Sequence, residues 1–260
     1  MKSGGTIEIP PLRERTNMTQ GLGSLIKKKF LGKNRNLVSL DEPYEVMARL
    51  LKDHRVTGMI DAGASNGRIS RRLLHKFPAA HAYAFEPNPL YAETLRQYAK
   101  DDNRFHPQFL ALSDHEGTAT LHVTESPGST SLFAPGNRLR QMQPEGASVK
   151  SLEQIELVTI DQWAQRSGDP AIQLMKFDIQ AGELKALQGA VRVLRSSTLL
   201  VYTEIWFNPV YEEGAIYSQI DLFLREHGFA LYDMFKPKYS PNGFLMWANA
   251  VFLNARRLGL

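Results

Sequence analysis

A short apolar run that ends at a pair of glycines constrains the fold of this chain more than any other feature. Residues 56–61 are largely apolar and end at Asp61. Gly63 and Gly67 follow, after which apolar side chains return at helical spacing as far as Phe77. This order predicts a strand, a tight turn and a helix. Because glycine lets the backbone turn sharply and lets a ligand approach the first amides of the helix, the pattern predicts a ligand site at the carboxyl end of the strand.

The end of the next apolar stretch favours a nucleoside as this ligand. Residues 81–86 end in Glu86, about where an acidic residue binds both hydroxyls of a ribose in dinucleotide sites. Asp61, at the end of the first strand, is an acceptor for a cationic amino group or for the amides of the turn. The glycine spacing is G-x-x-x-G rather than the G-x-G-x-x-G that wraps a pyrophosphate, so a mononucleoside is favoured over a dinucleotide.

From residue 56 onward, stretches with strand and helix character alternate along the chain. This alternation predicts an α/β fold, with a doubly wound, mostly parallel sheet and helices on both faces. With 260 residues and 43% hydrophobic content, the chain is long enough for one such domain and too short for two. We expect strands near residues 56–61, 81–86, 106–112, 172–178, 198–204, 229–234 and 247–254, and helices near residues 41–51, 67–77, 88–100, 182–194 and 215–227.

Two segments depart from this alternation. Residues 1–38 are rich in lysine and arginine, and we expect a basic N-terminal arm or partial cap ahead of a domain at residues 39–260. Residues 118–123 and 154–160 have strand character and bracket a polar stretch at residues 124–150. A long insertion without regular structure is usually functional or disordered, and this one is expected on the ligand side of the sheet. We therefore expect it to be a substrate lid.

Acidic residues stand at the ends of two later strands. Lys176 and Asp178 alternate with apolar neighbours, which places both on one face of their predicted strand, with Asp178 at its carboxyl end. Glu204 ends the next strand in the same way, and Glu183 lies near the start of the helix between them. Ligands of open α/β sheets bind at this edge, so these carboxylates are expected to converge beside the nucleoside site. Clustered carboxylates raise one another's pKa or bind a cation.

Short motifs at predicted strand ends and turns follow one another in a fixed order: Asp61 to Gly67, Phe85 to Pro89, Ala111 to Asp114, Val158 to Asp161, Lys176 to Gln180, and Glu183-Leu184 with Gly189-Ala190. Together they resemble the ordered motifs of the FkbM-type S-adenosylmethionine-dependent methyltransferases, over roughly residues 40–255. The resemblance implies a class I methyltransferase (Rossmann-like) fold with S-adenosylmethionine as the cofactor. It also implies O-methylation of a hydroxyl on a sugar, a glycan or a natural product.

Two positions depart from the pattern of this family. Where the family commonly has Gln-Gly-Ala-Glu-Leu, this chain has Gln-Ala-Gly-Glu-Leu at residues 180–184, so the glycine comes one place later, at Gly182. Near the C-terminus the family often has Asp-Ala-hydrophobic-Phe, and here Asn249 replaces the acid. Both positions lie outside the cofactor turn and concern the substrate side. The strand ends and the resemblance together predict the cofactor-binding residues Asp61, Gly63, Ala64, Ser65, Asn66, Gly67, Glu86, Pro87 and Asn88, with Ser113 and Asp114 near the adenine.

The expected reaction suggests which residues are catalytic. Methyl transfer from a sulfonium to oxygen is an in-line displacement, in which most of the catalysis comes from placing the nucleophile opposite the methyl group. An alcohol also has to lose its proton, and a carboxylate within hydrogen-bond distance can accept it. We therefore predict Asp178 and Glu204 as catalytic residues. A divalent ion could lower the pKa of the hydroxyl instead, but no ligand motif in the sequence supports a metal site.

Other side chains compete for roles at the acceptor. His115 and His122 flank a predicted hairpin that leads into the insertion, so they are the histidines to test as alternative bases. Several aromatic residues follow the predicted strand at 198–204: Trp206, Phe207, Tyr211 and Tyr217. They form either a platform on which a sugar face or an apolar acceptor packs, or part of the hydrophobic core.

The composition limits compartment and partners. The chain has no cysteine, which excludes disulfides, thiolate zinc sites and cysteine nucleophiles. It has neither a signal-peptide pattern nor an apolar run of the roughly twenty residues that cross a bilayer, so a cytoplasmic protein is expected. A formal net charge of +4 is modest and does not imply nucleic acid, so the expected partner is a small-molecule or glycan acceptor. A homo-oligomer remains open.

Three other functions are compatible with part of the pattern. N-methylation of an amine would need a site that orients nitrogen. A nicotinamide-dependent oxidoreductase is disfavoured by the missing pyrophosphate fingerprint. A non-catalytic nucleoside-binding module would keep the cofactor turn, and the departures at Gly182 and Asn249 would support it.

Overall fold

A seven-stranded sheet carries the fold in the computed structural model, which describes residues 42–259. Its strands are β1 (Gly58–Ala62), β2 (His81–Phe85), β3 (Phe105–Gln108), β7 (Leu174–Phe177), β8 (Leu200–Trp206), β9 (Phe229–Tyr239) and β10 (Leu245–Asn254). They lie in the order β3-β2-β1-β7-β8-β10-β9, and every pair is parallel except those that β10 makes with β8 and β9. The expected doubly wound, mostly parallel sheet is confirmed. The basic arm expected at residues 1–38 lies outside the described residues.

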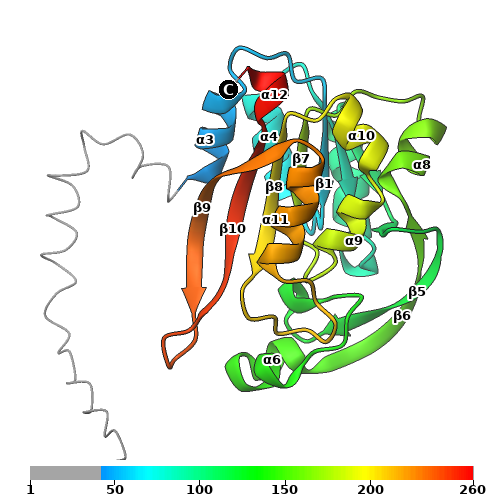
Figure 1. The fold of residues 1–260 in the computed structure, drawn as a ribbon. Coiled ribbons are helices and arrows are strands. Elements are labelled where there is room, and N and C mark those ends of the chain that lie inside the picture. The colour runs from blue at the N-terminus through cyan, green and yellow to red at the C-terminus, as the bar shows by residue number, and fades with distance from the viewer. Residues whose placement is uncertain (1–41, 260) are drawn as a thin grey trace, which may run out of the picture. The chain divides into compact units, whose positions relative to one another are not determined.

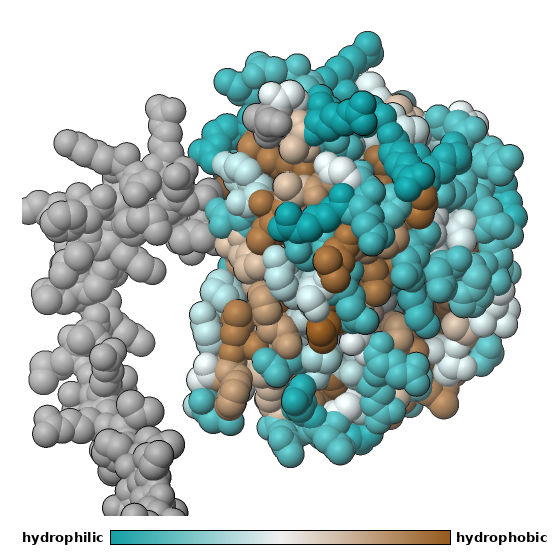
Figure 2. Space-filling model, in the orientation of Figure 1, coloured by the Kyte–Doolittle hydropathy of each residue, from teal (hydrophilic) through white to brown (hydrophobic). Residues whose placement is uncertain are grey.

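Helices cover both faces of this sheet, as Figure 1 shows. One face carries α3 (Pro43–Leu50), α4 (Arg68–Lys76) and α5 (Ala92–Asp101), and the other carries α8 (Ile160–Arg166), α9 (Glu183–Gln188), α10 (Val191–Ser196) and α11 (Tyr217–Glu226). A short helix, α12 (Ala255–Leu258), follows β10. Among the described residues, no helix is long and apolar enough to span a bilayer. On the face that Figure 2 shows, hydrophilic residues are interspersed with smaller hydrophobic patches.

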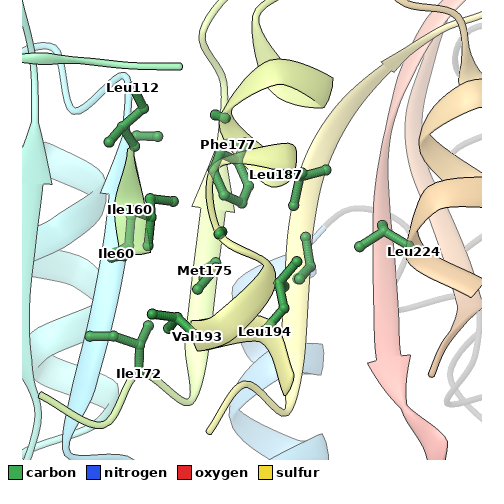
Figure 3. Close-up of a cluster of buried hydrophobic side chains, with 14 of the residues drawn as sticks. Ile60, Leu112, Ile160, Ile172, Met175, Phe177, Leu187, Val193, Leu194 and Leu224 are labelled. Atoms are coloured by element: carbon green, nitrogen blue, oxygen red, sulfur yellow. The ribbon is translucent and has the colours of Figure 1, made fainter. Parts of the chain in front are cut away.

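The main sheet has a hydrophobic core on each face, because side chains of its buried strands point to both faces. In β1 every residue is buried, and successive side chains alternate between the faces, with Met59 packed toward α4 and Ile60 toward the opposite helices. Figure 3 shows the core on the side of α8 to α11, in which Phe177 of β7 lies beside Leu187 of α9 and Met175 lies near Val193 of α10. This packing holds the sheet and therefore fixes the positions of the strand ends that carry the polar residues.

A smaller sheet lies beyond the carboxyl ends of the parallel strands, at the lower right of the view in Figure 1. It consists of β4 (Ala111–Leu112), β6 (Val149–Val158) and β5 (Gly117–Thr124), in that order. The insertion predicted at residues 124–150 follows β5 and contains η2 (Pro127–Ser129), α6 (Asn137–Met142) and α7 (Pro144–Ala147). The expectation of a stretch without regular structure was therefore wrong.

Several predicted strands have different boundaries in the structure. The strand predicted over residues 198–204 is β8 and runs to Trp206, so Glu204 lies inside the strand and not at its end. Two other differences have a clear cause. Residues 106–112 do not form one strand, because the chain leaves the main sheet after Gln108 and β4 pairs with β6 instead. The apolar run continues across this change of partner, so periodicity does not reveal it. The strand predicted to end at residue 160 ends at Val158, because Thr159 caps α8 with a hydroxyl that accepts the N–H of Gln162 at 3.1 Å.

The helix predicted over residues 182–194 is two helices, separated at Gly189. A Cβ atom at Gly189 would lie 2.1 Å from the carbonyl oxygen of Ser113, so this close approach requires glycine. The second helix, α10, then starts where the Asp161 carboxylate accepts the N–H groups of Arg192 at 2.8 Å and Val193 at 2.9 Å. The cap comes from a residue about thirty positions earlier in the chain, which a local pattern cannot show.

Candidate active site

The glycine turn after β1 has the geometry that its sequence predicts. Gly63 has φ +73° and Gly67 has φ +72°, a region that favours glycine. A Cβ atom at Gly63 would lie 1.9 Å from the carbonyl oxygen of Asp178, so the turn also packs directly on the loop after β7. The N–H groups of Gly63 and Ala64 both donate to the carbonyl of Phe85, at 3.0 and 3.1 Å, which ties the turn to the end of β2.

Glu86 links this turn to the next strand end. One of its carboxylate oxygens accepts the N–H of Ser65 at 2.7 Å, and the other accepts the N–H of Asn88 at 2.9 Å. Burial raises the pKa of Glu86 above its ordinary value, although these two backbone donors oppose the change. Asn88 is itself buried: its side-chain oxygen accepts the N–H of Leu90 at 3.0 Å, while its Nδ2 has no hydrogen-bond partner among the described residues.

Asp61 is buried and contacts two side chains of the protein. Its carboxylate forms an ion pair with Lys176 at 2.8 Å and accepts a hydrogen bond from the Ser70 hydroxyl at 2.6 Å. The Lys176 ammonium also donates to the carbonyls of Ala62 at 3.2 Å and Gly63 at 2.9 Å. Burial alone would lower the pKa of Lys176, but the nearby carboxylates, Asp61 above all, outweigh burial and raise it. The buried ion pair of Asp61 and Lys176 therefore stabilises the glycine turn.

A cavity opens at the carboxyl ends of the strands, between the glycine turn and the insertion; we call it the first cavity. Residues of the insertion, such as Pro127 and Ser131, line one side of it, and Leu110 and Leu112 line another. Its lining includes these predicted site residues: Gly63, Ser65, Glu86, Pro87, Asn88 and Asp178.

The other predicted cofactor residues do not line this cavity. Ala64, Asn66 and Gly67 belong to the same turn, and the side-chain oxygen of Asn66 accepts the N–H of Arg68 at 3.2 Å. Ser113 is buried and its hydroxyl donates to Asp114, which pairs with His115 at a separate surface depression. The residues just before them, 110–112, reach the first cavity instead.

The side-chain amide of Gln180 links the two predicted catalytic carboxylates, a role that the sequence patterns did not indicate. Nε2 of Gln180 donates to Oδ1 of Asp178 at 2.9 Å and to Oε2 of Glu204 at 3.1 Å. Asp178 is exposed toward the first cavity, whereas Glu204 is buried. Burial, together with the negative charges of Asp178 and Glu183, raises the pKa of Glu204 well above its ordinary value.

The loop that carries Gln180 is held in an unusual conformation. Gln180 has φ +53° and Ala181 has φ +83°, a region that non-glycine residues rarely adopt. Ala181 is the position where the family pattern commonly has glycine. Three contacts hold this loop: the Ser131 hydroxyl donates to the Gln180 carbonyl at 2.6 Å, the Tyr211 hydroxyl lies 2.9 Å from Oε1 of Gln180, and the Glu183 carboxylate accepts the N–H of Ile179 at 2.9 Å.

Gln180 also borders a second cavity, which lies beside the first and includes Glu204. Of the four aromatic residues proposed as a platform, Trp206 and Tyr211 line this second cavity. Phe207 and Tyr217 instead pack on each other, with ring centroids 5.3 Å apart, at the core under α11.

The competing bases are not at either cavity. His115 and His122 are absent from both linings, and His115 pairs with Asp114 on the surface. Within residues 42–259, no group of three or more histidine and acidic side chains is placed to hold a metal ion.

Comparison with known proteins decides the family. A model of the methyltransferase FkbM domain matches residues 61–231 of this chain. The chain belongs to this family. Membership in the FkbM family, together with the strand order, confirms the expected class I methyltransferase fold.

Individual relatives are more distant. The 2-O-methyltransferase NoeI of Sinorhizobium fredii (strain NBRC 101917 / NGR234) is 27% identical over 161 residues, which cover 59% of this chain and 65% of NoeI. The methyltransferase sdnD of Sordaria araneosa is 27% identical over 210 residues, which cover 72% of this chain and 79% of sdnD. The chain thus spans slightly less than two thirds of the length of NoeI. The solved structure of methyltransferase FkbM from Methylobacillus flagellatus KT has a TM-score of 0.45 and 16% identity, and the match covers 76% of this chain and 44% of that chain.

Proposed function

We propose that this protein is an S-adenosylmethionine-dependent O-methyltransferase that acts on a hydroxyl of a sugar, a glycan or a natural product. The observation that carries the proposal is the position of Asp178, whose exposed carboxylate lines the same cavity as Gly63 and Glu86. O-methylation needs a proton acceptor beside the methyl donor, and Asp178 supplies one. Membership in the FkbM family supports methyl transfer, and the 2-O-methyltransferase NoeI supports oxygen as the acceptor atom.

The first cavity offers the groups that a nucleoside cofactor needs. Glu86 presents a carboxylate suited to a vicinal diol, and the buried Nδ2 of Asn88 is a donor without a partner among the described residues. Leu110 and Leu112 provide apolar walls of the kind that cover a base. We assign Asp61 to the support of the turn through Lys176 rather than to contact with the cofactor.

Asp178 and Glu204 then have different roles. Bound S-adenosylmethionine would supply an activated methyl group. Because the pKa of Glu204 is raised, this carboxyl group holds a proton to higher pH than an exposed glutamate. We assign Asp178 as the general base that accepts the hydroxyl proton. Gln180 holds the Asp178 carboxylate in place from one side, and Glu204 orients the acceptor.

The ligand that binds the first cavity tests this proposal. Calorimetry with S-adenosylmethionine, S-adenosylhomocysteine and NAD should detect binding of the first two. Replacement of Glu86 by Gln keeps an acceptor but removes the charge and should weaken both, whereas Glu93→Gln, at an exposed position of α5, serves as the matched control. Binding of NAD alone would overturn the proposal.

A further inference from the structure

The second cavity shares part of its lining with the first. Gly128 of the insertion and Gln180 line both cavities. Gln180 donates to Asp178 on one side and to Glu204 on the other. A molecule in the second cavity would therefore lie one side chain away from the proposed base, which is where an acceptor belongs if the proposed function is correct.

Aromatic rings form one part of the lining of the second cavity. Trp206 and Tyr211 are buried and meet edge to face, with ring centroids 5.8 Å apart. Trp247, on the neighbouring strand β10, is half-buried and lines the cavity, and its ring centroid lies 5.2 Å from that of Trp206. The indole N–H of Trp206 is buried and has no hydrogen-bond partner among the described residues. Aromatic rings with a polar group nearby suit a ligand that has both apolar faces and polar edges.

The charge of the lining restricts the ligand further. Glu204 and Gln180 contribute polar atoms to the second cavity, and its described lining includes no lysine, arginine or histidine. A phosphate or carboxylate on the ligand would meet Glu204 and Asp178 without a compensating cation. A wholly apolar ligand would offer no hydrogen bond to the buried Glu204 carboxyl group, which has only Gln180 as a side-chain partner among the described residues, and this is also unfavourable.

We propose that the second cavity binds the acceptor as an uncharged sugar ring. The C–H face of the ring packs on Trp247, and hydroxyls at its edge bond with Glu204. The hydroxyl to be methylated points past Gln180 toward Asp178. This inference rests on the proposed function and narrows its acceptor to neutral carbohydrate, which leaves out phosphorylated sugars, uronic acids and nucleic acid.

Saturation-transfer-difference NMR tests the inference with the protein loaded with S-adenosylhomocysteine. The probes are the methyl glycosides of glucose, galactose and mannose, with the methyl glycosides of the matching uronic acids as the charged set. We expect transfer from protein to ring protons of at least one neutral glycoside and none to the uronic acids. Trp247→Ala should weaken this binding about tenfold, whereas Trp247→Phe, which keeps a ring, should weaken it less. Tyr232→Ala, at an exposed aromatic residue of β9 outside both linings, is the matched control.

The outcomes separate this inference from the proposed function. If every neutral glycoside fails to bind, if the uronic acids bind equally well, or if Trp247→Ala binds as the wild type does, the inference is wrong. Calorimetry with S-adenosylhomocysteine on the same samples reports on the first cavity alone. If the wild type binds S-adenosylhomocysteine but no sugar, only the inference is contradicted. If the wild type does not bind S-adenosylhomocysteine, the proposed function itself is contradicted.

Discussion

Replacement of Lys176 by Met tests whether a buried ion pair supports the cofactor turn. The side chains of Lys176 and Asp61 are 4% and 1% exposed, and the change leaves the Asp61 carboxylate buried with only Ser70 as a hydrogen-bond donor. Breaking a buried pair by removal of one partner costs about 3–5 kcal/mol. The carbonyls of Ala62 and Gly63 lose their donor as well. Because a domain is stable by about 5–15 kcal/mol, the variant should lose at least about a fifth of its free energy of unfolding.

Urea unfolding followed by circular dichroism measures this loss. Lys52→Met, at an exposed lysine, should stay within about 0.5 kcal/mol of the wild type. The double variant Lys176→Met with Asp61→Asn should be more stable than the sum of the single losses predicts, by about 2 kcal/mol. The raised pKa of Lys176 means that its contribution is fully present below the ordinary value of 10.5 and is lost only above the raised pKa, so the loss should be equal at pH 6 and pH 9. A loss below about 1 kcal/mol, or strict additivity, would refute the supporting role.

Three further changes test the loops and the buried acids. Gly63→Ala should abolish folding or S-adenosylhomocysteine binding, because its Cβ atom would lie 1.9 Å from the Asp178 carbonyl, and calorimetry and circular dichroism report both. Ala181→Gly should change the free energy of unfolding by less than about 1 kcal/mol, since relief of strain of about 1–2 kcal/mol offsets the lost methyl group and the added flexibility, whereas Ala186→Gly, in α9, should cost about 1.5–2 kcal/mol. Glu183 has a pKa raised to about 7 by burial, so the stability it contributes is fully present below about pH 4.5 and is lost as the pH rises through 7; Glu183→Gln should flatten this fall in the urea midpoint between pH 5 and pH 8.

Each of these three predictions has a result that would contradict it. A folded Gly63→Ala variant with normal cofactor affinity would mean that the turn tolerates a side chain. Equal losses for Ala181→Gly and Ala186→Gly would show that the positive φ carries no strain. An unchanged pH dependence in Glu183→Gln would show that another group causes the fall in stability.

Local backbone chemistry made the sheet and the glycine turn predictable. Gly63 and Gly67 adopt the conformation that only glycine adopts easily, and Glu86 directly follows β2, one residue beyond its last residue Phe85. The convergence of Asp178 and Glu204 followed from the rule that parallel strands end at one edge of the sheet.

Contacts between distant segments were not predictable from these patterns. Asp61 and Lys176 are adjacent only because β1 and β7 pair in a register that aligns them. The alternation around Lys176 predicts which face of its strand it lies on, but it does not predict that Asp61 is its partner. The second cavity is built from the insertion, the loop after β7 and strands β8 and β10, so no single stretch of sequence indicates it.

Methyl transfer by the Asp178→Asn variant tests the central proposal most directly. Methyl-labelled S-adenosylmethionine and an extract of the source organism are incubated with the protein, and the labelled product is identified by mass spectrometry. We expect the wild type and Asp53→Asn, at an exposed aspartate, to place the label on an oxygen of the same acceptor. Asp178→Asn should lower the rate by about 100-fold or more while its affinity for S-adenosylhomocysteine is unchanged. Label on nitrogen, or a normal rate in Asp178→Asn, would contradict the proposal.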